Sequence, residues 1–135
     1  MSILHKDNNG VIKEYTCGDS KYNLNYSTSE IDTGMTWIDG KKIYRKAIEI
    51  DPLVYSTVNT NTQLFTVSDI DSIITVKGTL WNSARTDVYN LEYTSGQNIT
   101  KVYFNTSDNY FYFKSTDTWS NARLVAILEY TKTTI

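Results

Sequence analysis

Residues 36–50, TWIDGKKIYRKAIEI, most constrain what this chain can fold into. Two apolar, β-favouring runs, at 35–38 and 42–50, meet at the pair Asp39-Gly40. Residues alternate along both runs as they do in strands, and Asp-Gly supplies the positive φ angles that a two-residue type I′ turn requires. The segment therefore predicts a tight β-hairpin.

The second strand of this hairpin has two distinct faces. Because alternate residues share a face, one face carries Tyr44, Lys46, Ile48 and Ile50, and the other carries Ile43, Arg45, Ala47 and Glu49. We expect the first face to be the core face, with Lys46 near an edge or an interface. Arg45 would pair with Glu49 or with a carboxylate across a subunit interface. Asp51-Pro52 should end the strand, since proline offers no ladder donor.

The rest of the chain repeats short apolar runs separated by polar turns about every 8–12 residues, as in sandwiches and jelly rolls. The runs lie at 73–81, 88–94, 99–105, 110–115 and 122–132, with an uncertain segment at 64–67. Abundant Thr (19), Ile (13) and Tyr (11) against 4 Ala also favour strands over helices. The predicted fold is an all-β, antiparallel β-sandwich, jelly-roll-like.

Two of these runs carry more specific predictions. In 73–81, Ile74, Val76, Gly78 and Leu80 share a face, and Gly78 should mark a bulge or a close backbone approach. In 110–113 the two Tyr and the two Phe should point to opposite faces. In 122–132 the predicted alternation sets Leu124, Ala126, Leu128 and Tyr130 against Val125, Ile127 and Glu129.

The length of 135 residues predicts one domain, with a hydrophobic core large enough to be stable without disulfides or bound metals. Cys17 is the only cysteine, so no internal disulfide can form. Residues 26–135 form the expected sandwich domain. Residues 1–25, with one candidate strand at 11–15, are interpreted as an N-terminal arm that docks on a neighbour or frays.

The charge and hydrophobicity of the chain limit the classes of partner and the location that we expect for it. A net charge of −2 and a pI near 5.3 argue against nucleic acid or an anionic membrane as partner. No stretch approaches the roughly 20 apolar residues of a membrane span, and the start MSILHKDNNG has no signal-peptide core. We expect a soluble chain made in a cytoplasm.

The segment at 26–48, YSTSEIDTGMTWIDGKKIYRKAI, resembles a motif of tail-fibre and receptor-binding proteins from phages and prophages. In that family a YST leader precedes a G-x-TWIDGK-x-IYRK hairpin at the start of a small C-terminal β domain. The ending LEYTKTT at 128–134 resembles the family's last strand. The middle of the chain carries only the general β pattern.

The resemblance implies a non-enzymatic virion component, often trimeric, placed where a fibre meets its surroundings. We expect a homotrimer, made in the bacterial cytoplasm, that attaches to a host-surface ligand, and the aromatic residues described below favour a glycan. Residues 1–25 would then contact other virion proteins. The hairpin would be a scaffold for strand register and subunit packing, and not the recognition surface, through Trp37, Asp39, Gly40, Tyr44 and Arg45. Two alternatives stay open: a head or baseplate decoration or assembly protein without host ligand, and a monomeric carbohydrate-binding module.

Catalysis has few candidate groups. A Ser/His/Asp arrangement needs a histidine base, and the only one is His5 in the polar N-terminal stretch. The carboxylate pairs Glu30/Asp32 and Asp69/Asp71 are expected to be solvated, and the second lacks the Gly and distal Glu of a Ca²⁺ loop. We expect no catalytic residues, no metal and no cofactor.

The sequence has more candidate residues for ligand binding than for catalysis, namely aromatic residues near turns. Both Trp81 and Trp119 are followed by a Ser/Asn pair and then Ala-Arg, so each ring has polar partners close by. Sugar faces stack on such rings, although core or interface packing uses the same residues. The candidate ligand residues are Trp81, Asn82, Arg85, Trp119, Asn121 and Arg123.

Overall fold

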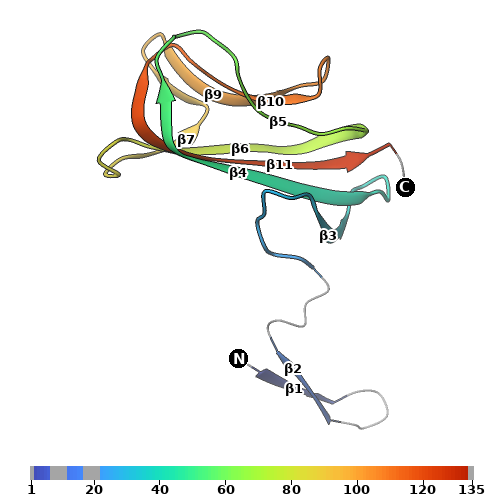
Figure 1. Cartoon of the computed structure of the whole chain (residues 1–135). Helices are drawn as coiled ribbons and strands as arrows, with labels where there is room; N and C mark the ends of the chain where they lie inside the picture. Colours follow the sequence, from blue (N-terminus) through green and yellow to red (C-terminus); the bar gives the residue numbers. More distant parts are fainter. Residues whose placement is uncertain (1, 7–11, 17–21, 134–135) are drawn as a thin grey trace.

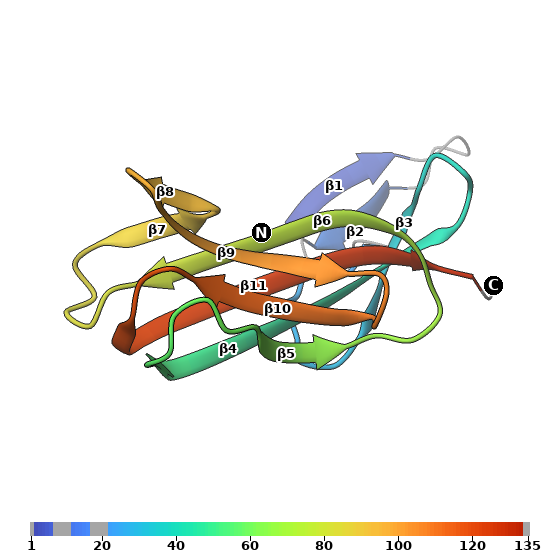
Figure 2. The same cartoon turned by 90° about the horizontal axis from the view of Figure 1, so that it is seen from above.

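A computed structural model describes residues 2–6, 12–16 and 22–133 of the chain, with side chains for 22–133. Two antiparallel sheets pack face to face (Figures 1 and 2), which confirms the predicted β-sandwich. The five-stranded sheet has the order β3 (Ile31–Thr36), β4 (Lys42–Tyr55), β11 (Trp119–Lys132), β6 (Ile70–Trp81) and β7 (Val88–Leu91). The four-stranded sheet has the order β5 (Thr62–Thr66), β10 (Tyr110–Ser115), β9 (Asn98–Asn105) and β8 (Tyr93–Ser95).

The first two strands form a separate hairpin. β1 (Ser2–Lys6) pairs antiparallel with β2 (Ile12–Thr16) in a two-stranded sheet that joins neither layer of the sandwich. β2 overlaps the candidate strand at 11–15. His5 belongs to β1, whose side chains are not described, and Cys17 lies outside the described residues.

The core lies between β11 and β10, where alternate residues point inward. Leu124 and Leu128 of β11 are fully buried, as are Phe111 and Phe113 of β10. The predicted alternation in both runs is therefore confirmed. Burying large apolar side chains between two sheets is the main stabilising contribution to such a fold.

The opening hairpin is present, but its turn differs from the prediction. Gly40 N–H donates to the Trp37 carbonyl at 2.9 Å, and Trp37 N–H donates to the Lys41 carbonyl at 2.8 Å. Gly40 adopts φ +86° while Asp39 does not have a positive φ. The loop is therefore a three-residue turn closed by a left-handed glycine, not a type I′ turn. Asp39 Oδ1 accepts the Lys41 N–H at 3.0 Å and fixes this geometry.

Pro52 does not end its strand, contrary to the prediction. β4 continues to Tyr55, and its register against β11 shifts between Ile50 and Leu53. β3 pairs with β4 only as far as Arg45, so this part of β4 is a sheet edge. A bulge at an edge tolerates proline because no ladder bond needs its missing N–H.

The predicted strand at 88–94 is in fact two strands. β7 pairs with β6 in one sheet, and β8 pairs with β9 in the other, so the chain crosses between the layers at Glu92. Tyr89 and Tyr93 lie on the two sides of this crossing with ring centroids 4.5 Å apart. Alternation predicts strands but does not show that a run changes its partner.

The strand β4 is covered on both faces. Its predicted core face packs on the core cluster through Tyr44, Ile48 and Ile50, which confirms that prediction. On the opposite face Arg45 and Ala47 are buried because residues 22–30, here called the strap, cross over them (Figure 1), whereas Glu49 is exposed. The Ala47 N–H donates to the Ser27 carbonyl at 2.9 Å, so the strap continues the sheet edge beyond β3.

Gly78 marks a close approach between the two sheets, as predicted. A Cβ built there would lie 2.8 Å from Val102 Cγ2 on β9. We expect Gly78→Ala to lower the free energy of unfolding by about 1–3 kcal/mol, because overpacking forces neighbours out of place. Urea denaturation measures this. In a double-mutant cycle the cost should shrink when Val102 is alanine, and strictly additive free energies would contradict the steric account.

Candidate functional site

The structure gathers five of the six predicted ligand residues at one corner of the five-stranded sheet. Trp81 and Arg123 are cross-strand partners on β6 and β11, and the guanidinium lies 4.3 Å from a ring centroid of the indole. Arg123 also pairs with Glu49 at 2.8 Å. One face of the Trp81 ring is thus covered by a cation held in an exposed ion pair.

The polar residues of this corner hold the loop between β6 and β7. Arg85 donates to the Asn121 carbonyl at 2.7 Å and to Asp51 Oδ1 at 2.5 Å. Asn82 Oδ1 accepts the N–H groups of Thr86 and Asp87, at 2.9 and 3.2 Å. These groups fold the loop against the start of β11, so their hydrogen bonds are already used within the chain.

Trp119 lies apart from the other predicted ligand residues. Its ring is partly buried against the core cluster and meets the Tyr89 ring edge-on at 6.0 Å. Its indole N–H donates to Ser115 Oγ at 3.2 Å. These contacts fit core packing, which is the structural alternative to ligand binding that the sequence left open for Trp119.

Arg45 is buried, and its partner differs from both expectations. It pairs within the chain with Glu129, directly opposite on β11, at 3.0 Å. Glu49 instead pairs with Arg123. The Arg45 guanidinium also donates to the carbonyls of Asn23 and Asn25 in the strap, at 3.0 and 3.1 Å. A cross-strand neighbour on the same face is nearer than a residue two pleats along the same strand, which explains the choice of partner.

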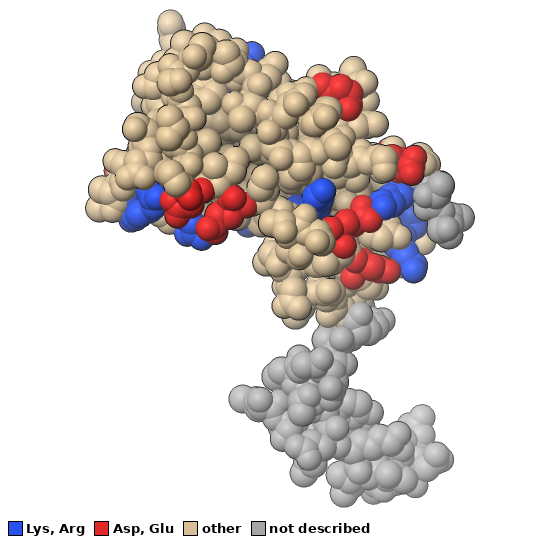
Figure 3. Space-filling model, in the orientation of Figure 1, with Lys and Arg blue, Asp and Glu red and all other residues tan. Residues whose placement is uncertain are grey.

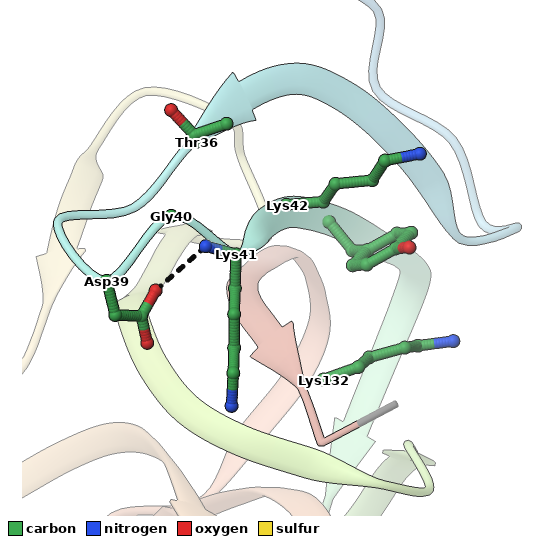
Figure 4. Close-up of a pocket in the computed structure, with 7 residues that line it drawn as sticks. Thr36, Asp39, Gly40, Lys41, Lys42 and Lys132 are labelled. Carbon is green, nitrogen blue, oxygen red and sulfur yellow. Dashed lines mark hydrogen bonds between the residues drawn. The ribbon is translucent and has the colours of Figure 1, made fainter. Parts of the chain in front are cut away.

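A hollow of about 380 Å³ lies beside the hairpin turn (Figure 4). Its volume falls within the roughly 300–1,000 Å³ of small-molecule sites. It is lined by Thr36, Asp39, Gly40, Lys41, Lys42, Tyr44 and Lys132. Two further hollows, of about 200 Å³ beside the strap and 190 Å³ near Thr116, are smaller than that range. We call the first one the hairpin pocket.

Lysines dominate the charge of the hairpin pocket. Figure 4 shows Lys42 and Lys132 extending to the same side, from β4 and from the end of β11, whereas Lys41 points away from them. Lys41 pairs with Asp71 at 2.6 Å and Lys132 pairs with Glu30 at 2.5 Å. Figure 3 shows that charged side chains on this face of the molecule gather around the five-stranded sheet and few lie over the four-stranded sheet.

Lys42 has the loosest partner of the three lysines. Its ammonium lies 3.4 Å from Asp32 Oδ2, and its side chain is 63% exposed. The Gly34 N–H, which donates to Asp32 Oδ1, lowers the pKa of that carboxyl, which therefore stays charged at neutral pH. An exposed pair of this kind contributes little to stability, so the Lys42 ammonium can change partners at small cost.

Tyr44 supplies the aromatic surface of the hairpin pocket. The Lys132 ammonium lies 4.9 Å from the centroid of its ring. The ring also stacks against the fully buried Tyr130, with centroids 6.2 Å apart. Tyr130 in turn donates its hydroxyl proton to Glu30, which is the partner of Lys132. Ring and lysine are thus fixed by a common set of contacts.

Burial, followed by the hydrogen bond to Glu30, strongly raises the pKa of Tyr130. A tyrosine with a raised pKa stabilises the fold below pH 10, its ordinary pKa, and this contribution is lost as pH rises above 10. We expect the free energy of unfolding to fall above pH 10 by up to about 1.4 kcal/mol per pH unit from this group. Denaturant titrations at pH 8–11 should show a smaller fall in Tyr130→Phe. An equal fall in both proteins would contradict the assignment.

A row of tyrosines on the outer face of the four-stranded sheet was only partly predicted. Tyr103 and Tyr112 are cross-strand partners whose rings stack at 5.4 Å, and Tyr110 lies 6.1 Å from Tyr112. The Lys101 ammonium lies 5.2 Å from the Tyr103 centroid. None of these three tyrosines lines one of the hollows described above, which makes this row a weaker candidate for a ligand site.

The predicted carboxylate pairs make contacts of their own. Glu30 binds Tyr130 and Lys132, and Asp71 binds Lys41, while the Asp69 carbonyl accepts the Thr133 N–H at 2.7 Å. Within residues 22–133, no group of three His, Cys, Asp or Glu side chains could hold a metal ion.

No family model, curated protein or solved structure matches the chain. Within its described part, no helix is long and apolar enough to cross a membrane. The resemblance to tail-fibre proteins stays a prediction made from the residues at 26–48 and 128–134. Those two segments supply all seven residues that line the hairpin pocket.

Proposed function

We propose that this chain is a non-enzymatic structural protein of a phage or prophage virion, in a tail fibre or receptor-binding head, that attaches to a host-surface glycan. One observation supports this most directly. The segment at 26–48, which resembles a tail-fibre motif, supplies six of the seven residues that line a hollow of ligand size, about 380 Å³.

The groups that line the hairpin pocket are those that recognise sugars. The Tyr44 ring, with the Lys132 ammonium 4.9 Å from its centroid, gives the pocket an apolar surface beside a cation. The Thr36 hydroxyl, the Asp39 carboxylate and the lysine ammonium groups can take hydrogen bonds with sugar hydroxyls. An apolar surface with a few fixed polar groups is the usual composition of such a site. The hairpin is thus both a scaffold and a recognition element in this proposal.

The protein acts as a homotrimer, and attachment depends on avidity. Three weak sites on one rigid head bind a multivalent surface far more tightly than one site does. Two apolar side chains in the motif segment are available for subunit contacts, since Tyr26 is 63% exposed and Ile38 is 91% exposed. Residues 1–25 contact other virion proteins, and the trimer is incorporated in the virion.

Light scattering coupled to size-exclusion chromatography, followed by a glycan array, tests this proposal. We expect a mass three times 15.5 kDa and binding to a defined set of glycans. A monomer that binds glycans would support a carbohydrate-binding module instead. A trimer that binds no glycan would support a decoration or assembly protein. Either result overturns the proposal.

A further inference from the structure

We infer that the hairpin pocket selects acidic sugars, meaning a six-membered sugar ring that carries a carboxylate. This inference rests on the proposed function and specifies its ligand class. Two sources of this chemistry are uronic acids and sialic acids. The argument uses the charge, the exposure and the aromatic wall of the pocket.

More lysines than carboxylates line the hairpin pocket. Three lysines line it against one carboxylate, that of Asp39. The carboxylates that pair with these lysines, on Glu30, Asp32 and Asp71, are not among the lining residues. Each of these carboxylates lies within 3.4 Å of the ammonium group of its lysine, so a ligand anion must compete for that ammonium group, and the three pairs differ in length and exposure. The lysine with the longest and most exposed pair is therefore the one that can turn to an anionic ligand.

Lys42 is the residue that we assign to the ligand carboxylate. Its side chain is the most exposed of the three, and its ammonium is 3.4 Å from Asp32, compared with 2.5–2.6 Å for the other two pairs. A ligand carboxylate can take this ammonium without breaking a short ion pair. Lys132 is held by Glu30 and by the Tyr44 ring, so it contributes charge from a fixed position.

The aromatic wall is already in place for a sugar ring. Tyr44 stacks on Tyr130, which is fully buried, so its ring has little freedom to lose on binding. The volume of about 380 Å³ lies near the lower end of the small-molecule range, which suits a short sugar unit. Lys42 and Lys132 project to the same side of the pocket (Figure 4).

Titration calorimetry of the full chain with glucuronic acid, N-acetylneuraminic acid and neutral glucose tests this inference. We expect at least one acid to bind and glucose to bind at least tenfold more weakly, since a hydrogen bond to a charged group is worth about that factor or more. Comparing the two acids identifies the source of the carboxylate. Binding should weaken as salt is raised.

Two variants that change the affinity for the acid in opposite directions make the test independent of folding, because misfolding would only weaken binding. Lys42→Gln should lose about tenfold in affinity for the acid. Asp39→Asn keeps the Oδ1 acceptor for the Lys41 N–H and should bind the acid more tightly. Lys77→Gln, on the outer face of β6, is the matched control and should leave affinity unchanged.

The outcomes separate this inference from the function on which it rests. Glucose binding as tightly as the acids, or Lys42→Gln and Asp39→Asn both leaving acid affinity unchanged, overturns the acidic selectivity while glycan attachment stands. Binding of neither acid also overturns it. If no glycan on the array binds either, the proposed function fails as well.

Discussion

Replacing Arg45 by alanine should lower the free energy of unfolding by about 3–5 kcal/mol, as expected when one partner of a buried ion pair is removed. The Arg45 side chain is only 8% exposed and Glu129, its partner, is 20% exposed. The change leaves the Glu129 carboxylate without its cation and two strap carbonyls, of Asn23 and Asn25, without a donor. Urea denaturation followed by tryptophan fluorescence measures the loss.

Arg123→Ala is the matched control for Arg45→Ala. Arg123 belongs to the same sheet and pairs with a glutamate at 2.8 Å, but its side chain is 33% exposed and Glu49 is 53% exposed. Exposed pairs are worth about 0–1 kcal/mol, so Arg123→Ala should cost far less. Equal costs for the two variants would show that burial beneath the strap does not matter.

Trp119→Ala should be destabilising by about 3 kcal/mol, the cost of removing a large aromatic side chain from a packed position. The ring packs on the core cluster and against Tyr89, and its N–H donates to Ser115. Thermal unfolding by circular dichroism should show a clear drop in the midpoint temperature.

Trp81→Ala provides the comparison within the same sequence pattern. Trp81 packs against the Arg123 guanidinium on the outer face of the sheet, a contact worth about 0.5–1 kcal/mol when exposed. We expect a cost near 1 kcal/mol and no change in binding at the hairpin pocket. Equal destabilisation by Trp81→Ala and Trp119→Ala would contradict the claim that Trp119 packs on the core while Trp81 lies on the outer face of the sheet.

The layers of the fold could be predicted from the sequence because one side of most strands is buried and the other is not. The alternation at 122–130 follows directly from that asymmetry, whereas at 110–113 the outer-face Tyr112 is also buried, against the rings of Tyr103 and Tyr110. The run at 88–94 shows the limit of the method. Its residues alternate throughout, yet the chain leaves one sheet and enters the other at Glu92. Strand partners depend on contacts distant in sequence.

The strap was not predicted because nothing in its composition marks it as an element. Residues 22–30 are mostly polar and have no apolar period. They nevertheless cover Arg45 and Ala47, through backbone carbonyls that any residue could supply. The burial of Arg45 therefore could not be predicted from the β4 pattern, which assigns its face to solvent or to a subunit contact.

The hairpin pocket was missed for a different reason. Its residues were identified as a scaffold because strand signals and turn signals dominate that stretch of sequence. Lys132, almost 90 residues beyond Tyr44, completes the pocket because β11 is the direct neighbour of β4. Only the pairing of these two strands brings the second cation beside the ring.

A nuclear magnetic resonance titration of isotope-labelled protein with the acidic sugar that binds tests the central claim most directly. Backbone amide signals of residues 36–42 and of Lys132 should shift in a saturable manner, while the indole signal of Trp81 stays unchanged. Shifts confined to the Trp81 corner or to the tyrosine row, with the hairpin signals unmoved, would contradict the claim that this protein binds its ligand at the hairpin.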